Sequence, residues 1–225
     1  MKFICTHTDF KAPTGDYTIV SNKPLNNKYN LPVVVADNLL KPLEYSYAEG
    51  YMIYDIWNKY NEDWIAINHY RRYLLKGNNE TTLAKPLYQN MHWQYKECHN
   101  INDLLKVESI IDKYFPEYSL DYKEINKIYP CNMFILNKED FNNYCNFVFS
   151  VLQRFSEENN LFTDEDVKKY VESNKQYYKK FDLSYQSRLH GFLMERIGTI
   201  FFLNYLKNKP FNTIEITITN EKITY

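Results

Sequence analysis

The densest group of chemically active side chains in this 225-residue sequence follows the short apolar run Trp64 to Ile67. Directly after this run the chain reads Asn-His-Tyr-Arg-Arg-Tyr, from Asn68 to Tyr73. A run too short for a typical helix and bounded by polar residues predicts a buried strand. In open α/β sheets ligands bind beyond the carboxyl ends of the strands, and adjacent guanidinium groups favour an anion there. We therefore predict a phosphate or pyrophosphate site formed by His69, Tyr70, Arg71 and Arg72.

The opening of the chain offers a second strand end. Phe3 to Thr6 predicts the first strand, because a short apolar run is followed there by polar residues. Nucleotides often bind near the end of a first strand in α/β folds, so Thr6 and His7 are candidate contacts for the same ligand. An ordinary strand ending is an equally good interpretation of these residues, and both interpretations stay open.

Sugar-binding chemistry is concentrated in the segment from Pro86 to Asn100. This segment is too polar for a core strand and is rich in groups that hydrogen-bond or stack on rings, so we predict an irregular substrate loop. Its candidate acceptor contacts are His92, Trp93 and His99. His92 and His99 are seven residues apart, which suits a metal pair on a helix, but no carboxylate partner lies close in sequence. We therefore predict no metal site here.

The elements that must position these groups alternate between strands and helices. Further strands are predicted at residues 17–20, 32–37, 129–136 and 214–218, and helices at 43–60, 102–115, 137–155 and 187–206. Residues 156–186 are polar and predict an irregular excursion. Its Asp164-Glu165-Asp166, the single Asp-x-Asp of the sequence, looks like the capped start of a short helix and is discounted as a metal site. This order predicts one α/β domain over residues 1–225 with a helix-rich second half.

Composition excludes several classes of function. Lys and Arg number 27 against 28 Asp and Glu, with an isoelectric point near 6.5, so nucleic acid is not an expected partner. The four cysteines show no metal or disulfide spacing and fit free thiols in a reducing compartment. The sequence shows no signal-peptide core and no membrane-spanning run. We expect a cytoplasmic protein, with peripheral attachment to the inner face of a membrane left open.

Four segments carry a resemblance when they are taken together. They are Tyr-Ala-Glu-Gly at 47–50 leading to Asp-Trp-Ile at 63–65, Asn-His-Tyr-Arg-Arg-Tyr at 68–73, Asn-Met-Phe-Ile at 132–135 with Tyr-Cys at 144–145, and Arg-Leu-His-Gly-Phe-Leu-Met-Glu-Arg at 188–196. In this order and spacing the chain resembles a bacterial family of glycosyltransferases of capsule and exopolysaccharide synthesis, known as domain of unknown function 4422. One departure is Tyr129-Pro130-Cys131, where family members often carry a histidine.

The resemblance implies a glycosyltransferase of the hexosyltransferase class on a GT-A-like, Rossmann-like scaffold. Its donor would be a nucleotide-sugar, UDP-linked by expectation, and its acceptor a growing surface polysaccharide or a lipid-linked glycan. Metal-dependent proteins of that fold hold an ion on an Asp-x-Asp after a central strand, whereas His69, Arg71 and Arg72 stand in the comparable place here. Because fixed cations can stabilise charge on the leaving phosphate, we expect transfer without a metal or other cofactor. Within the matching segments, Arg188 is assigned to the donor, and Asn132, His190 and Gly191 to the acceptor.

An inverting transfer also needs a carboxylate that deprotonates the acceptor hydroxyl. Glu195 is the first choice, because it lies near the start of an otherwise apolar helix that could point its acid into the cleft. Glu49 and Asp103 follow. Two alternatives stay open, because Glu195 equally fits a buried ion pair with an arginine and Glu49 a solvated helix residue. A nucleotide- or glycan-binding module without catalysis would need no carboxylate and is the alternative function.

Overall fold

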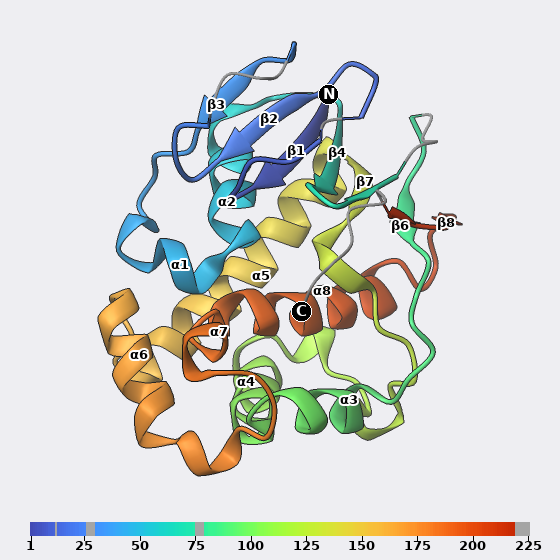
Figure 1. The fold of residues 1–225 in the computed structure, drawn as a ribbon. Coiled ribbons are helices and arrows are strands. Elements are labelled where there is room, and N and C mark those ends of the chain that lie inside the picture. The colour runs from blue at the N-terminus through green and yellow to red at the C-terminus, as the bar shows by residue number, and fades with distance from the viewer. Residues whose placement is uncertain (12, 26–29, 75–78, 219–225) are drawn as a thin grey trace.

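The computed structural model describes residues 1–11, 13–25, 30–74 and 79–218. In this part of the chain a mixed sheet has the strand order β3-β2-β1-β4-β7-β6-β8, with β5 beside β4 and β9 beside β5. Figure 1 shows the strands gathered at one end of the molecule and most of the helices at the other. The strands are β1 (Lys2–Thr6), β2 (Thr18–Ser21), β3 (Val33–Val35), β4 (Trp64–His69), β5 (Arg72–Tyr73), β6 (Thr82–Ala84), β7 (Phe134–Asn137), β8 (Asn212–Ile214) and β9 (Thr217–Ile218).

The first four long strands create a crevice between β1 and β4. These strands are parallel, and the chain passes outward from β1 to β2 and β3 before it returns to the other side of β1 at β4. Such a reversal of strand order leaves an opening at the carboxyl ends of the two central strands. In the β1–β4 register Cys5 lies opposite His69, so both strands end at the same level.

The helices of the described residues are α1 (Glu44–Tyr47), α2 (Glu49–Lys59), α3 (Met91–Cys98), α4 (Ile101–Tyr114), α5 (Lys138–Asn159), α6 (Asp164–Ser173), α7 (Leu183–Gln186) and α8 (Leu189–Tyr205). Side chains cap several of them as the sequence predicts. Asn100 accepts the backbone N–H of Asn102 at the start of α4, and Asn137 accepts that of Asp140 at the start of α5. Thr163 and Asp166 form a capping box, which confirms the capped helix start predicted there.

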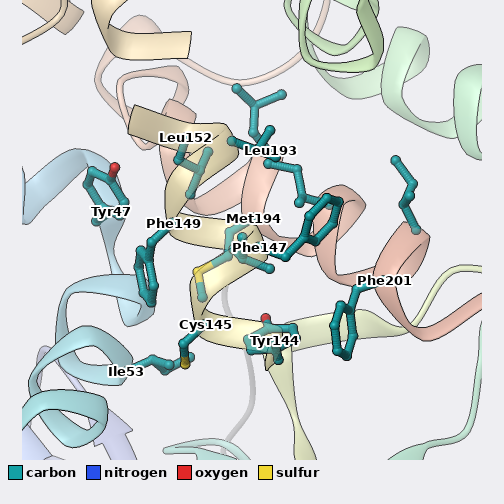
Figure 2. Packing of buried hydrophobic residues seen from close by; sticks show 14 of the residues in the cluster. Tyr47, Ile53, Tyr144, Cys145, Phe147, Phe149, Leu152, Leu193, Met194 and Phe201 are labelled. Carbon is teal, nitrogen blue, oxygen red and sulfur yellow. The ribbon is translucent and has the colours of Figure 1, made fainter. Parts of the chain in front are cut away.

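The core lies between the sheet and the long helices α5 and α8. α8 is buried on nearly all sides and packs against α1, α2, α4 and α5. Figure 2 shows aromatic and aliphatic side chains filling the space between α5 and α8, with Tyr144 and Phe201 among them. The ring centroids of these two residues lie 5.5 Å apart in an edge-to-face arrangement. A helix held on so many faces presents its amino-terminal turns to the crevice in one fixed orientation.

Five predicted elements differ from the observed ones. The strand predicted over residues 129–136 begins only at Phe134, because a 3₁₀ helix occupies Pro130–Asn132. The helix predicted over residues 43–60 is broken at Ala48, whose φ of 50° no helix allows. The segment 86–100, predicted as an irregular loop, contains α3, because Met91 and Tyr95 turn inward and supply a packing face that its polar residues obscure. The excursion 156–186 contains α6 and α7. The single closing strand is divided into β8 and β9, and β6 was not predicted.

Candidate functional site

A cleft of about 470 Å³, measured with its open mouth, lies beyond the carboxyl end of β4. Its walls come from the β4–β5 turn, the start of α2, the segment before β7 and the first two turns of α8. The structure thus brings together eight residues that the sequence predicted from separate segments: Glu49, His69, Arg71, Arg72, Asn132, Arg188, Gly191 and Glu195. Ala48, Cys131, Tyr185 and Phe192 also line this cleft and were not predicted.

The turn after β4 fixes the imidazole of His69. Its Nδ1 accepts the backbone N–H of Arg71 at 3.2 Å, and its Nε2 lies 3.1 Å from Oε1 of Glu49. His69 thus links the arginine turn to Glu49, with Nδ1 facing the Arg71 N–H and Nε2 facing the Glu49 carboxylate.

Glu49 is the carboxylate at the centre of the cleft's hydrogen-bond network. Besides His69, it accepts Nη2 of Arg188 at 3.2 Å on Oε2. Burial raises the pKa of Glu49, but the hydrogen bond from His69 and the charge of Arg188 outweigh burial and hold that pKa well below its usual range. Glu49 is therefore ionised, and both of its oxygens accept hydrogen bonds. The alternative that it is a solvated helix residue is wrong.

The arginines of the cleft present donors to its interior. The Arg71 guanidinium lies over the Tyr70 ring at 4.8 Å, and its Nε is buried without a hydrogen-bond partner among the residues that the structure describes. Arg72 donates from Nη1 to Sγ of Cys131 at 3.0 Å. A thiol is a weak acceptor, so this contact leaves most of the guanidinium's hydrogen-bonding capacity for a stronger anion. Together with Arg188, these side chains favour a ligand with several negative oxygens.

Glu195 has a different environment from Glu49. Its Oε1 accepts the backbone N–H of Cys131 at 2.8 Å, and its Oε2 pairs with Nη1 of Arg196 at 3.0 Å. The side chain is 26% exposed and faces the cleft. The predicted pairing with an arginine is thus confirmed for Arg196, while part of the carboxylate remains open to the cleft. An accessible carboxylate of this kind can accept a proton from a bound hydroxyl.

Three residues of the cleft have left-handed backbone conformations that non-glycine residues rarely adopt. Their φ angles are 50° at Ala48, 65° at Cys131 and 49° at Asn132. Such conformations cost about 1–3 kcal/mol each and collect at functional sites, where the surrounding structure enforces them. Ala48 begins α2 and so sets the direction of Glu49, while Cys131 turns its N–H toward Glu195. The strain thus lies at residues that position both carboxylates.

A second, more open cavity of about 880 Å³ adjoins the first and shares Ala48, Tyr185 and Arg188 with it. It extends along the carboxyl ends of β1 and β2, where His7, Asn22 and Lys23 line it. Burial lowers the pKa of His7 to about 4, so its contact with Glu49 at 4.0 Å involves a neutral imidazole near pH 7. The two cavities are therefore neighbours at the carboxyl ends of β1, β2 and β4.

Two predicted donor contacts lie behind the cleft surface. Thr6 is fully buried and its hydroxyl donates to the Thr8 carbonyl at 2.6 Å, so the ordinary strand-ending interpretation holds for it. Tyr70 is also buried and supports the site from beneath, since its ring meets His7 edge-on at 5.0 Å and carries Arg71 on its face.

The predicted acceptor contacts His92, Trp93, His99 and His190 do not line the cleft. His190 is fully buried between the hydroxyls of Ser46 and Ser156, each 2.7 Å from a ring nitrogen. His99 is buried against Phe192, and its Nδ1 lies 2.8 Å from Oε1 of Gln186. His92 pairs with Glu108 on α4, and Trp93 is exposed on α3. These residues lie in the scaffold or on its surface, away from the cleft. Their positions do not fit the predicted contact with the acceptor.

Asp103, the third candidate base, is buried under α6 and away from the cleft. Its carboxylate accepts the hydroxyls of Tyr170 at 2.6 Å and Tyr178 at 3.3 Å. Burial raises the pKa of Asp103 to about 6. Gly191, by contrast, does line the cleft, but a Cβ there would approach the Tyr47 carbonyl to 3.2 Å. Its absent side chain lets α8 approach the α1–α2 junction.

The donor set of the cleft does not fit a divalent cation. Its carboxylates are Glu49 and Glu195, and both already accept hydrogen bonds from an arginine and from a further donor. No three or more His, Cys, Asp or Glu side chains are arranged to hold a metal within the described ranges. Asp164, in the discounted Asp-x-Asp, instead accepts the backbone N–H groups of Tyr45 and Ser46 at 2.9 and 2.8 Å.

The residues that sequence reasoning missed had no strong local signal. Ala48 and Cys131 contribute through a backbone conformation that cannot be predicted from the residue type. Tyr185 and Phe192 are aromatic residues in a sequence that contains many of them. Within the described part of the chain, no helix has both the length and the apolar character needed to cross a bilayer.

Comparisons with known proteins agree with this architecture. The chain is similar in structure to the apo form of WbbM, described as a bifunctional glycosyltransferase, with a TM-score of 0.71 at 15% sequence identity. The match covers 98% of this chain but 45% of WbbM, so this chain spans less than half of that protein's length. At this identity the likeness shows a shared fold. The comparison with curated proteins found no match. Residues 81–208, more than half of the sequence, match the family described as domain of unknown function DUF4422, and the chain therefore belongs to that family.

Proposed function

We propose that this protein is a glycosyltransferase that moves a sugar from a nucleotide-sugar donor to a glycan acceptor. The observation that carries the proposal is the cleft at the β1–β4 crevice, which Arg71, Arg72 and Arg188 line together. The buried Nε of Arg71 has no hydrogen-bond acceptor among the described residues. The shared fold with a glycosyltransferase and the sequence resemblance support it. A UDP-linked donor is our first candidate, on a GT-A-like scaffold.

The donor diphosphate binds the arginines in this proposal. Two guanidinium groups at a strand end offer forked donors that match phosphate oxygens, and Arg188 adds a third from the opposite wall. As the sugar leaves, negative charge grows on the terminal phosphate, and fixed cations lower the energy of that state. Because no carboxylate pair of the cleft is free for an ion, the reaction is metal-independent in this proposal.

In the proposed transfer one bond forms and one bond breaks at the anomeric carbon of the donor sugar. The acceptor hydroxyl oxygen forms a bond to the anomeric carbon, the bond from that carbon to the diphosphate oxygen breaks, and its electron pair leaves with the nucleoside diphosphate. The hydroxyl proton passes to Glu195, whose carboxylate is partly open to the cleft. Glu49 is less suited to this role because its pKa is lowered and its side chain is 14% exposed, against 26% for Glu195.

The acceptor in this proposal is a surface-polysaccharide or lipid-linked glycan, which the family resemblance supports. Handling such an acceptor would place the protein in the cytoplasm at the inner face of the membrane. No nucleic acid is involved, since the charge balance of 27 basic against 28 acidic residues offers no attraction for it.

The first experiment measures donor binding and slow donor hydrolysis together. A panel of nucleoside diphosphates and nucleotide-sugars is screened by thermal shift, because a ligand of the folded state raises the melting temperature. Release of nucleoside diphosphate from the stabilising donor is then followed with EDTA and with added Mg²⁺ or Mn²⁺. We expect release that EDTA does not reduce.

Three results of this experiment would count against the proposal. Activity lost in EDTA and restored by metal contradicts metal independence. Stabilisation without release, even with glycan acceptors present, favours the non-catalytic binding module. Absence of stabilisation by every nucleotide contradicts the donor class itself.

A further inference from the structure

A row of aromatic rings leads from the protein surface into the cleft. Phe181 precedes α7, Tyr185 belongs to α7, and Phe192 lies in the first turn of α8. The ring centroids of Phe181 and Tyr185 are 4.6 Å apart, and those of Tyr185 and Phe192 are 5.0 Å apart. Phe192 in turn stacks on the buried His99 at 4.1 Å. The inner two rings line the cleft, while Phe181 is 52% exposed, so the row joins cleft and solvent.

The outer ring is held in a conformation that its own preferences oppose. Phe181 has a φ of 64°, in the left-handed region that a bulky side chain rarely adopts. Asn160, with a φ of 55°, meets the same backbone demand at the end of α5 with a residue that tolerates it. Burial does not account for Phe181 either, because half of its surface faces water. Strain of this kind, at an exposed aromatic residue beside a cleft, indicates a functional position.

The rings lie between the groups that the proposed reaction uses. Phe192 and Glu195 lie three residues apart on one face of α8, and Arg188 immediately precedes that helix, so that all three line the cleft. The guanidinium of Arg188 lies 5.7 Å from the centroid of Tyr185 and 5.9 Å from that of Phe192. A ligand ring on this surface is therefore placed between the donor arginine and Glu195.

We propose that Phe181, Tyr185 and Phe192 form the acceptor subsite, on which a pyranose ring of the acceptor glycan stacks. The flat face of a pyranose presents C–H groups with slight positive charge, which suits the negative face of an aromatic ring. At the inner end of the row Phe192 lies about one helical turn before Glu195, and the glycan continues outward over the exposed ring of Phe181. This inference rests on the proposed function and names the acceptor contact of the same cleft.

The test uses simple sugars as probes, so that it does not depend on the natural acceptor. Methyl pyranosides of glucose, galactose, mannose and N-acetylglucosamine are titrated in saturation-transfer NMR, with and without saturating UDP. We expect transfer to the ring C–H protons of at least one sugar. In Phe181→Ala the apparent affinity falls about tenfold, the ratio that corresponds to loss of about 1.4 kcal/mol.

Matched variants separate stacking from folding. Phe162→Ala removes an aromatic ring that is 55% exposed at the loop between α5 and α6, and it should leave sugar contact unchanged. Phe181→Trp keeps a ring face and should keep binding. Phe181→Gly removes the ring and also the backbone strain, so it should weaken sugar contact while the melting temperature is held or raised. Phe192→Leu tests the inner ring with an apolar side chain.

The outcomes distinguish this inference from the proposed function. Sugar contact that Phe181→Ala leaves unchanged, or absence of contact with all four pyranosides, overturns the acceptor subsite. In either case stabilisation by a nucleoside diphosphate leaves the proposed function standing. If no nucleoside diphosphate stabilises the unchanged protein, the proposed function fails instead, while pyranoside contact on the ring row would still show a glycan-binding surface.

Discussion

Glu49 and Glu195 are the two carboxylates of one cleft, yet their surroundings differ, and on this difference we base the different tasks proposed for them. Glu49 is held by the imidazole of His69 and the guanidinium of Arg188, and its pKa lies well below the usual range. Glu195 accepts a backbone N–H and pairs with Arg196, and a quarter of its side chain stays exposed. The comparison teaches that residue type alone does not identify a base. A carboxylate with a strongly lowered pKa holds its neighbours in place by hydrogen bonds. A carboxylate that is partly exposed to the cleft can accept a proton from a ligand.

The largest effect expected from this comparison is on turnover in Glu195→Gln. An amide cannot accept the hydroxyl proton, so the rate should fall by about 10²–10⁴-fold, the usual contribution of a positioned base. Donor affinity should change little, and release of nucleoside diphosphate from the folded variant measures the rate. Glu165→Gln, at an exposed position of α6, is the control. Full turnover in Glu195→Gln would reject the base role.

Glu49→Gln should instead lower stability, by about 3 kcal/mol, because it leaves a partly buried arginine without its counter-charge. The pKa of Glu49 is lower in the folded state than in the unfolded chain, so this stabilisation is complete above the unfolded value of about 4.3 and declines as pH falls below it. Urea unfolding of both proteins from pH 7 to pH 3 measures the difference.

Glu195→Gln under the same urea titration completes the comparison. Its carboxylate is more exposed, but the Arg196 side chain with which it pairs is 4% exposed, so a loss of stability is expected in this variant too. A loss in Glu49→Gln that does not shrink at low pH would contradict an ionised Glu49 with a lowered pKa.

Arg71→Lys tests whether the anion lies on the Glu49 side of the cleft. A lysine keeps the charge but loses the forked donors, so affinity for a nucleoside diphosphate should fall about tenfold. Isothermal titration calorimetry measures this affinity. Arg154→Lys, whose guanidinium lies over Tyr114 on the surface of α5, is the control. An unchanged affinity in Arg71→Lys would remove Arg71 from the donor site.

The smallest expected effect concerns the backbone that aims Glu49. Ala48→Gly should raise stability by about 1 kcal/mol, because glycine adopts the positive φ at this position without strain. Ala36→Gly makes the same chemical change at a buried residue that is not among those with positive φ, and it should destabilise. Thermal unfolding compares the two. A loss of stability in Ala48→Gly would show that the conformation of Ala48 stores no strain.

Features that depend on neighbours in sequence were predicted well. The capped start of α6 was recognisable because the Thr163 side chain bonds to backbone three residues away. The β4 strand was recognisable as a short apolar run, and the arginines directly follow it. α3 was missed because its inward residues Met91 and Tyr95 are embedded in polar sequence, and only packing reveals which face is buried.

The sequence by itself predicted an anionic ligand, because His69, Arg71 and Arg72 follow a buried strand and a strand end is where such groups meet an anion. It also placed candidate carboxylates on helices. Only the tertiary structure distinguished the surroundings of those carboxylates. The difference depends on contacts between segments that lie far apart in the chain, such as Glu49 with Arg188 and Glu195 with Cys131, and those contacts set burial and charge around each group. Such contacts between distant segments cannot be predicted from the local sequence.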